Sequence, residues 1–278
     1  MTELARRSGP LARVRVADFA DGQSSSDVHE REDVVAAEEP LELRVAWPGA
    51  AARRAWVTMR TPGHDFELAA GWVVHEGLIG RSELTEVAYC TDEDLEPEQE
   101  LNVVTVRSSS PVDLVHRHSG LSSGSSACGV CGKDSIAAAL TTVRGPRWDG
   151  PAADPSVVRR LPALLREGQS VFARTGGVHA AGLFSDAGEV LVCREDIGRH
   201  NAVDKVTGAR VLAGETPAAP YLAVSGRAGF ELVQKAVASG VGALVAVGAP
   251  SSLAVHLARE AGLGLFGFTR DERTVRYS

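Results

Sequence analysis

The sequence predicts a mixed α/β protein in which a small α+β domain precedes a larger domain with a mostly parallel sheet between helices. Two short segments on either side of residue 48 alternate apolar and polar residues, as strands of a hairpin do. Beyond residue 150, helical and strand-like segments alternate, which is typical of a parallel sheet covered by helices. The 278 residues, 44% of them hydrophobic, can supply a core for both parts.

Residues 1–39 combine charged residues, Ser and Gly with little periodicity. We expect them to form a mainly flexible arm, with one strand near Val14 and Val16. The arm also has no apolar run of the kind found in secretory signal peptides. We therefore expect a protein of the reducing cytoplasm.

Residues 40–112 are predicted to form the small α+β domain. A hairpin turns at Pro48-Gly49, and the spacing of Phe66, Ala69 and Val73 indicates a helix. Two further strands flank an acidic loop. In order, we expect strands at 41–47 and 56–60, a helix at 66–74, and strands at 87–90 and 101–106.

Residues 113–150 are predicted to hold a polar loop, a short helix and a linker. The loop is rich in Ser and poor in large apolar side chains up to residue 126. Ile136, Leu140 and Val143 then follow helical spacing.

Residues 151–278 are predicted to form an αβα domain. Gly and Pro residues interrupt its uncharged stretch between 236 and 255, so no membrane segment is expected. We expect helices at 157–166, 201–212, 230–238 and 252–260, and strands at 171–174, 179–184, 189–193, 222–225, 243–247 and 263–268.

The sharpest chemical feature is the pair Cys128 and Cys131. Both residues precede a predicted helix, whose unpaired N–H groups and dipole favour a thiolate, and Lys133 adds positive charge. A thiolate is the form that attacks an activated sulfur atom. Gly129 and Gly132 keep the loop slim enough to enter the site of another protein. The pair is our candidate for catalysis.

Other uses of a Cys-x-x-Cys pair are less favoured. A four-cysteine zinc site needs a second close pair, but Cys90 and Cys193 stand apart in the sequence. A thioredoxin-like site follows the first strand of a βαβ unit, and none is predicted there. A structural pair on a Ser-rich loop would be poorly buried. These arguments favour a chemical role without saying which chemistry it is.

Polar loops follow the strands of the second half. Parallel strands bring such loops to one edge of a sheet. Arg199, Arg227, Arg270 and Arg273 lie in these loops, which predicts a basic edge on a chain with a net charge of −7. Helix starts with small residues and arginines bind phosphate groups, so we expect a large anionic ligand. Each loop taken alone is better explained as a capped helix start.

Several classes of function are disfavoured. A sequence pI of about 5.7 argues against general nucleic-acid binding. No P-loop and no G-x-G-x-x-G after a strand occurs, which argues against an NTPase or a nicotinamide enzyme. His179 and His200 are candidates for chemistry, although a lone histidine is more often structural. Glu195 and Asp196 are expected to orient one of these histidines or to cap the following helix.

Together, several blocks of the sequence resemble the FdhD family of formate dehydrogenase accessory sulfurtransferases. They run in order from about residue 41 to the end and are specific as a set, though none alone is decisive. The blocks are Ala127-Cys-Gly-Val-Cys-Gly132, Thr175-Gly-Gly-Val-His-Ala-Ala181, Arg194-Glu-Asp-Ile-Gly-Arg-His-Asn-Ala-Val-Asp-Lys205, Ser225-Gly-Arg227 with Glu231-Leu-Val-Gln-Lys235, Ala249-Pro-Ser-Ser-Leu253 and Gly267-Phe-Thr-Arg270.

The resemblance implies a function. Proteins of this family receive sulfur from a cysteine desulfurase and pass it to the molybdenum bis(molybdopterin guanine dinucleotide) cofactor of formate dehydrogenase. It also implies a homodimer, a cytidine-deaminase-like αβα domain and no bound metal of its own. By the same resemblance, Cys128 carries the persulfide and Cys131 assists it. We expect cofactor contacts among Phe268, Thr269, Arg270, Asp271, Glu272, Arg273, Arg227, Arg199 and His200, with Arg270 and Arg273 favoured over the acidic pair between them.

Two other functions stay open. A non-catalytic chaperone would hold the cofactor for insertion into formate dehydrogenase without using the cysteines. A dithiol oxidoreductase would reduce disulfides and ignore guanine nucleotides. Deamination is disfavoured, because a zinc deaminase needs H-x-E before its cysteine pair and His179-Ala-Ala181 lacks that carboxylate.

Overall fold

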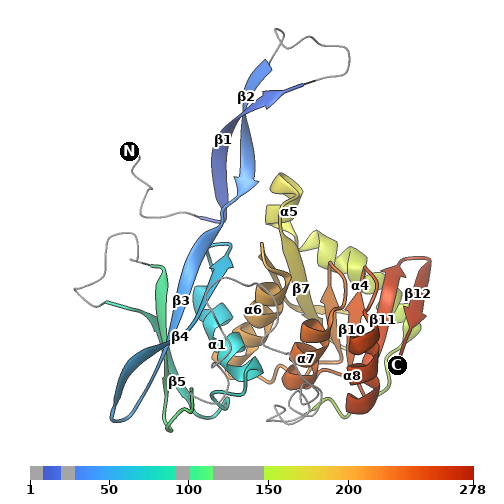
Figure 1. Ribbon diagram of the computed structural model, residues 1–278. Helices are drawn as coiled ribbons and strands as arrows, with labels where there is room; N and C mark the ends of the chain where they lie inside the picture. The colour runs from blue at the N-terminus through green and yellow to red at the C-terminus, as the bar shows by residue number, and fades with distance from the viewer. Residues whose placement is uncertain (1–8, 20–28, 92–100, 115–146) are drawn as a thin grey trace.

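The computed structural model describes residues 9–19, 29–91, 101–114 and 147–278. Over these ranges the chain has the predicted mixed α/β fold, with a six-stranded sheet, a four-stranded sheet and a two-stranded ribbon (Figure 1). The domain boundaries near residues 39, 112 and 150, and the likeness to cytidine deaminases, stay predictions.

The six-stranded sheet is mostly parallel. Its order is β12-β11-β10-β9-β7-β8, and within it β7 and β12 run against the other four strands. The strands are β7 (His179–Phe184), β8 (Val190–Asp196), β9 (Tyr221–Val224), β10 (Ala243–Ala246), β11 (Gly264–Arg270) and β12 (Arg273–Arg276).

Helices cover both faces of this sheet. Because side chains alternate along a strand, Leu222 and Val224 of β9 pack among three helices on one face, while Tyr221 and Ala223 pack against one helix on the other. None of the helices in the described ranges has the length and apolar content needed to cross a membrane. The first face holds α6 (Arg199–Leu212), α7 (Phe230–Ser239) and α8 (Ser252–Ala261), and the second holds α4 (Pro155–Glu167).

The smaller sheet packs its apolar face on helix α1 (Asp65–His75). Leu41, Leu43 and Val45 alternate with more exposed residues along β3, as the hairpin pattern predicted. In the order β4-β3-β6-β5, its strands are β4 (Ala50–Arg60), β3 (Glu39–Trp47), β6 (Val103–Ser108) and β5 (Leu84–Tyr89).

Helix α1 also contacts α6, so it joins the two sheets. Two glycines permit the close approach of these helices. A Cβ atom at Gly71 would lie 1.9 Å from the carbonyl oxygen of Asp204, and one at Gly208 would lie 1.8 Å from that of Glu67. The two backbones are therefore in direct contact, which leaves no room for a side chain at either glycine.

A buried polar network crosses the same junction. His75 of α1 places Nδ1 2.5 Å from Oδ1 of Asp204 and Nε2 2.7 Å from Oγ of Ser239. Lys235 donates to both carboxylate oxygens of Asp204, at 2.7 and 3.0 Å. Burial lowers the pKa of His75. The neutral imidazole then donates from Nδ1 to Asp204, which leaves Nε2 as a hydrogen-bond acceptor beside the Ser239 hydroxyl, whose oxygen also lies 2.9 Å from the carbonyl of Lys235.

A second buried group of charges holds the start of α6. Asp196 accepts hydrogen bonds from the backbone N–H groups of Thr61 and Gly198, at 3.2 and 2.8 Å. It also pairs with Lys205 at 2.7 Å, and Lys205 donates to the carbonyl of Thr61 at 2.9 Å. Of the two roles expected for Asp196, these contacts fit the support of the following helix.

Part of the predicted N-terminal arm forms an antiparallel ribbon, β1 (Leu11–Asp18) and β2 (His29–Ala36), which extends away from the rest of the described structure (Figure 1). The strand expected near Val14 and Val16 is present. The sequence does not predict its partner, because half of the residues of β2, at positions 30–33, are charged and the strand has little apolar alternation. Besides the backbone pairing, ion pairs such as Arg31 with Asp18, at 2.8 Å, connect the two strands.

One predicted strand is wrong. Residues 171–174 lie in helix α5 (Ser170–Thr175). Val171 and Phe172 favour a strand by propensity, but the Glu195 carboxylate accepts both of their backbone N–H groups at 2.8 Å and so caps a helix. Glu195 therefore caps α5 rather than the helix that follows it in sequence. The other elements predicted in the described ranges are present, and β12 is an addition.

Candidate functional site

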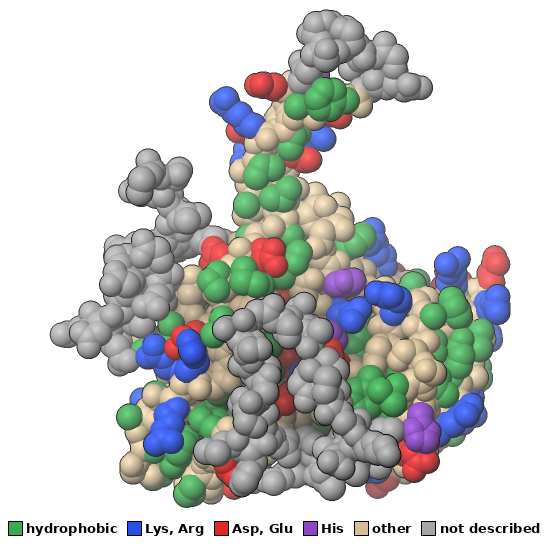
Figure 2. All heavy atoms as spheres, in the orientation of Figure 1, with side chains coloured by type: hydrophobic (Ala, Val, Ile, Leu, Met, Phe, Trp, Pro, Cys, Tyr) green, Lys and Arg blue, Asp and Glu red, His purple; other side chains and the backbone are tan. Residues whose placement is uncertain are grey.

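The carboxyl ends of β8, β9, β10 and β11 lie at one edge of the large sheet, because these strands run in the same direction. Strand β7 runs the opposite way, which brings its first residue, His179, to the same edge. Backbone hydrogen bonds join neighbouring loops, from Gly248 to Gly226 at 3.0 Å and from Phe268 to Gly248 at 3.1 Å. Figure 2 shows a small group of basic and histidine side chains together near the centre of the face in view. The predicted polar loops thus meet at one edge.

A pocket of about 590 Å³ opens at this edge. Thr269, Arg270 and Asp271 of the predicted cofactor segment line it, together with His179 and Ser225. Thr269 is buried, whereas Arg270 and Asp271 are exposed and bring charge to the pocket. The other lining residues are Pro162, Ala163, Leu165, Arg166, Gln169, Phe172, Gly176, Gly177, Val178 and Val247.

The wall of the pocket contributed by α4, α5 and their connection was not foreseen. The guanidinium carbon of Arg166 lies 4.0 Å from the centre of the Phe172 ring. Gln169 is 5% exposed, and its Nε2 atom has no hydrogen-bond partner in the part of the chain that the structure describes. No sequence motif marks these residues as ligand contacts, because their segment contains only the patterns of a helix and a strand.

Arg199 and His200 lie close to His179 but do not line the pocket. His200 Nε2 lies 2.7 Å from Glu231 Oε2, and the hydrogen bond lowers the pKa of Glu231. Burial, followed by the charges of Arg199 and His200, lowers the pKa of His179. His179 is therefore a neutral imidazole at neutral pH, able both to donate and to accept a hydrogen bond.

The remaining predicted contacts also lie outside the pocket lining. Arg227 is exposed and lies against Gly248. Phe268 is 45% exposed and has a φ of 50°, in the left-handed region, where β11 is bulged. Glu272 and Arg273 are exposed where β11 turns into β12. Strained backbone of the kind found at Phe268 is enriched at functional sites.

Cys128 and Cys131 lie outside the described residues. Of the cysteines that are described, Cys90 and Cys193 are both free thiols. Burial, with a smaller effect of Glu195, raises the pKa of Cys193 to about 11. Its sulfur therefore stays protonated at neutral pH and is a poor nucleophile.

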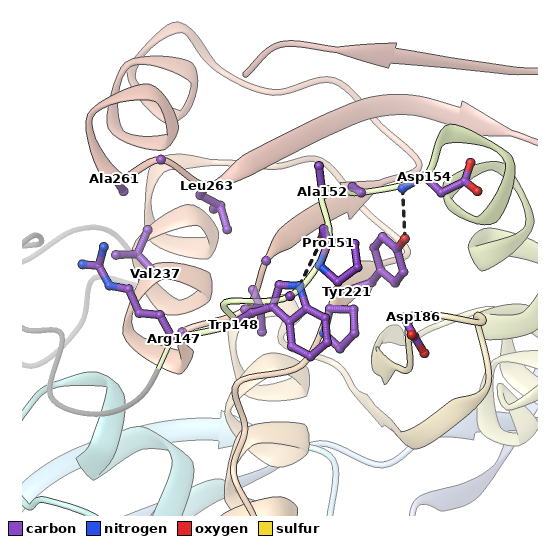
Figure 3. A pocket seen from close by; sticks show the side chains of 17 residues that line it. Arg147, Trp148, Pro151, Ala152, Asp154, Asp186, Tyr221, Val237, Ala261 and Leu263 are labelled. Atoms are coloured by element: carbon purple, nitrogen blue, oxygen red, sulfur yellow. Dashed lines mark hydrogen bonds between the residues drawn. The ribbon is translucent and has the colours of Figure 1, made fainter.

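A second pocket, of about 530 Å³, opens at the opposite edge of the same sheet (Figure 3). It lies at the amino ends of the parallel strands, where Trp148 donates to the carbonyl of Pro151 at 3.2 Å and the backbone N–H of Asp154 donates to the Tyr221 hydroxyl at 3.1 Å. None of the site residues predicted from the sequence lines it.

Comparison with known proteins decides the family, since the FdhD/NarQ family matches residues 36–278. The chain belongs to the FdhD/NarQ family. The sulfur carrier protein FdhD of Streptomyces avermitilis is 46% identical over 265 residues, which cover 93% of this chain and 90% of that protein. The corresponding protein of Nocardia farcinica is 48% identical over 251 residues, covering 89% and 87%. The resemblance inferred from the sequence blocks is thereby confirmed.

The FdhD/NarQ assignment is accompanied by a structural likeness. A crystal structure of a candidate formate dehydrogenase accessory protein from Desulfotalea psychrophila matches this chain with a TM-score of 0.71 and 22% identity, covering 96% of each chain. At that identity the likeness supports the fold alone. The range matched by the FdhD/NarQ family includes both the cysteine pair and every residue of the pocket.

Proposed function

We propose that this chain is a sulfurtransferase that carries a persulfide on Cys128, from a cysteine desulfurase to the molybdenum bis(molybdopterin guanine dinucleotide) cofactor of formate dehydrogenase. One observation carries the proposal: the cysteine pair lies within the range matched by the FdhD/NarQ family, whose similar members are named sulfur carrier proteins. The high pKa of Cys193, about 11, supports assigning the sulfur to Cys128 and Cys131 rather than to Cys193.

The first step loads the sulfur. The Cys128 thiolate attacks the terminal sulfur of a persulfide on the desulfurase, a new S–S bond forms on Cys128, and the donor cysteine leaves as a thiolate. One S–S bond replaces another, so no oxidant or reductant is needed.

The second step delivers sulfur at the oxidation level of sulfide. The Cys131 thiolate attacks Sγ of Cys128, and the terminal sulfur leaves with the bonding electron pair and passes to the acceptor substrate. The sulfur gains two electrons, and the two cysteines lose them as they form a disulfide. A cellular dithiol reductant then restores both thiols. The three-residue spacing of Cys128 and Cys131 suits such a disulfide.

The pocket at the sheet edge is the proposed binding site of the acceptor substrate. Its volume of about 590 Å³ suits one nucleotide end of the cofactor rather than the whole molecule. Arg270 supplies positive charge for phosphate groups, and Phe172 supplies an aromatic face for a base. Arg270→Ala should therefore weaken the binding of GDP, measured by calorimetry.

The loading step can be tested by intact-protein mass spectrometry after incubation with a cysteine desulfurase and cysteine. We expect the mass of one added sulfur atom, which a reductant removes and which Cys128→Ala does not acquire. Cys90→Ala and Cys193→Ala are matched controls and should load normally. A Cys128→Ala protein that still gains sulfur, or a wild-type protein that gains none, contradicts the proposal.

A cell-based measurement separates sulfur transfer from a chaperone role. A strain that lacks this protein should regain formate dehydrogenase activity with the wild-type chain and not with Cys128→Ala. Full activity with Cys128→Ala would favour a non-catalytic chaperone that only holds the cofactor.

A further inference from the structure

Gln169 has an unusual environment for a buried amide. Its side chain is 5% exposed and lines the pocket at the sheet edge, yet its Nε2 atom finds no acceptor among the described residues. A buried donor without a partner is destabilising, and such groups in native proteins are rare. A ligand acceptor in the pocket would satisfy it.

The backbone around Gln169 is fixed. Its N–H donates to the carbonyl of Arg166 at 3.1 Å, and its own carbonyl accepts from Ala173 at 3.0 Å. The next turn is held by Glu195, which accepts the N–H groups of Val171 and Phe172 at 2.8 Å. The segment is tied on both sides, so the backbone that carries the Gln169 side chain at the pocket is fixed before any ligand arrives.

The surroundings of Gln169 indicate the chemical class of the ligand. Phe172 offers an aromatic ring, with the Arg166 guanidinium 4.0 Å from its centre, and both line the same pocket. Such a platform binds a flat heteroaromatic group by stacking. Arg270 joins the lining from another element, the end of β11, and is exposed, which suits phosphate groups that remain partly hydrated.

We infer that Gln169 binds the guanine base of the nucleotide, with its amide nitrogen donating to an acceptor on the base, O6 or N7. This assignment rests on the proposed function, which supplies a guanine nucleotide as ligand. It divides the pocket into a base subsite around Gln169 and Phe172 and a phosphate subsite at Arg270. Gln169 is then a positioning group for the substrate that no sequence motif marked.

The inference predicts opposite effects of one substitution on affinity and on stability. Gln169→Leu removes the unpaired donor but keeps the approximate volume. The free protein should be at least as stable as the wild type, because a buried unsatisfied group has been replaced by an apolar one. The affinity for GDP should fall roughly tenfold, as expected for a lost hydrogen bond of about 1.4 kcal/mol. If the role of Gln169 were purely structural, Gln169→Leu would lower both the stability and the affinity for GDP.

Calorimetry with the full-length protein can test this, using GDP and inorganic pyrophosphate as probes. For Gln169→Leu we expect weaker GDP binding, unchanged pyrophosphate binding and no drop in melting temperature. Arg270→Ala should weaken the binding of both GDP and pyrophosphate. Gln234→Leu makes the same chemical change on α7 at a partly exposed position outside the pocket, and it should leave all three measurements unchanged.

Unchanged GDP affinity in Gln169→Leu would overturn the inference and leave the proposed function standing. Equal losses for GDP and pyrophosphate, or a lower melting temperature, would also overturn it, because Gln169 would then act on the phosphates or on folding. If the wild-type protein binds no GDP, nucleotide recognition in the proposed function fails and the inference fails with it.

Discussion

Among single residues, His75 couples the stability of the protein to pH. Its side chain is inaccessible to solvent and lies between Asp204 and Ser239. Burial alone would raise the pKa of Asp204, but Lys235 and the hydrogen bond from His75 hold it below its usual value. The site therefore contains one carboxylate, one ammonium group and one neutral imidazole. A proton added to the imidazole would be an additional buried charge.

The protein should lose stability as the pH falls below about 6.5, the usual pKa of histidine. The folded-state pKa of His75 is lower than this value, so the unfolded chain binds the proton first. Acid then favours unfolding, with a slope of at most about 1.4 kcal/mol per pH unit from this residue. Urea unfolding at several pH values measures the slope.

The contribution of His75 to this pH dependence is the difference between the slopes measured for the wild type and for His75→Gln. The variant should show a smaller slope between about pH 7 and 5. His256→Gln replaces an exposed histidine of α8 and should keep the wild-type slope. A slope that does not change in His75→Gln would show that this imidazole does not set the pH dependence.

Among the described elements, helices α1 and α6 are in direct backbone contact. Gly71→Ala should lower the free energy of unfolding by about 3 kcal/mol or more, because the new methyl group would lie 1.9 Å from a backbone oxygen that cannot easily move. Chemical denaturation followed by circular dichroism measures the loss. Gly177→Ala is the matched control, since its nearest neighbour is an ordinary 3.6 Å away. Equal stability of the two variants would contradict this reading of the helix contact.

The secondary structure could be predicted wherever a segment's own pattern agrees with its packing. Buried Leu41, Leu43 and Val45 give β3 a clear alternation. The strand expected at 171–174 is a helix because a cap from Glu195, distant in sequence, outweighs the local preference. Strand β2 has little apolar alternation and pairs with β1 across a largely exposed ribbon.

The candidate site could be predicted in part. The direction of parallel strands was enough to bring the polar loops together, and Thr269, Arg270 and Asp271 do line one pocket. The position of His179 depends on β7 running against its neighbours. Gln169 could not be found from the sequence, because what distinguishes it is a buried amide nitrogen with no acceptor among the described residues, a property of the folded chain alone.

In the whole molecule, the six-stranded and four-stranded sheets are tied together by α1 and by charged groups. Arg194, at the end of β8, donates to both carboxylate oxygens of Glu67 at 2.5 and 2.7 Å. Burial alone would raise the pKa of Glu67, but the hydrogen bonds from Arg194 and His64 lower it to about 2. With the Asp196 and Asp204 networks, these contacts make independent unfolding of either sheet costly.

We therefore expect one cooperative unfolding transition for the parts that contain the two sheets. Tryptophan fluorescence reports mainly on the small sheet, where Trp56 and Trp72 stack with ring centres 4.9 Å apart. Far-ultraviolet circular dichroism reports mainly on the helices of the large sheet. The two midpoints in urea should coincide. Separate midpoints would show that the halves unfold independently.

The Ser239, His75 and Asp204 side chains stand in the order found in serine hydrolases, with hydroxyl, imidazole and carboxylate in a row. In this protein, however, the three side chains are buried and serve the fold rather than catalysis. Ser239 is 2% exposed and also lies 3.0 Å from Thr207 Oγ1, so no ester or amide can reach its oxygen. Organophosphorus reagents that label hydrolases should leave Ser239 unmodified in the folded protein. The three side chain types that catalyse bond cleavage in hydrolases here connect α1, α6 and α7 through buried hydrogen bonds.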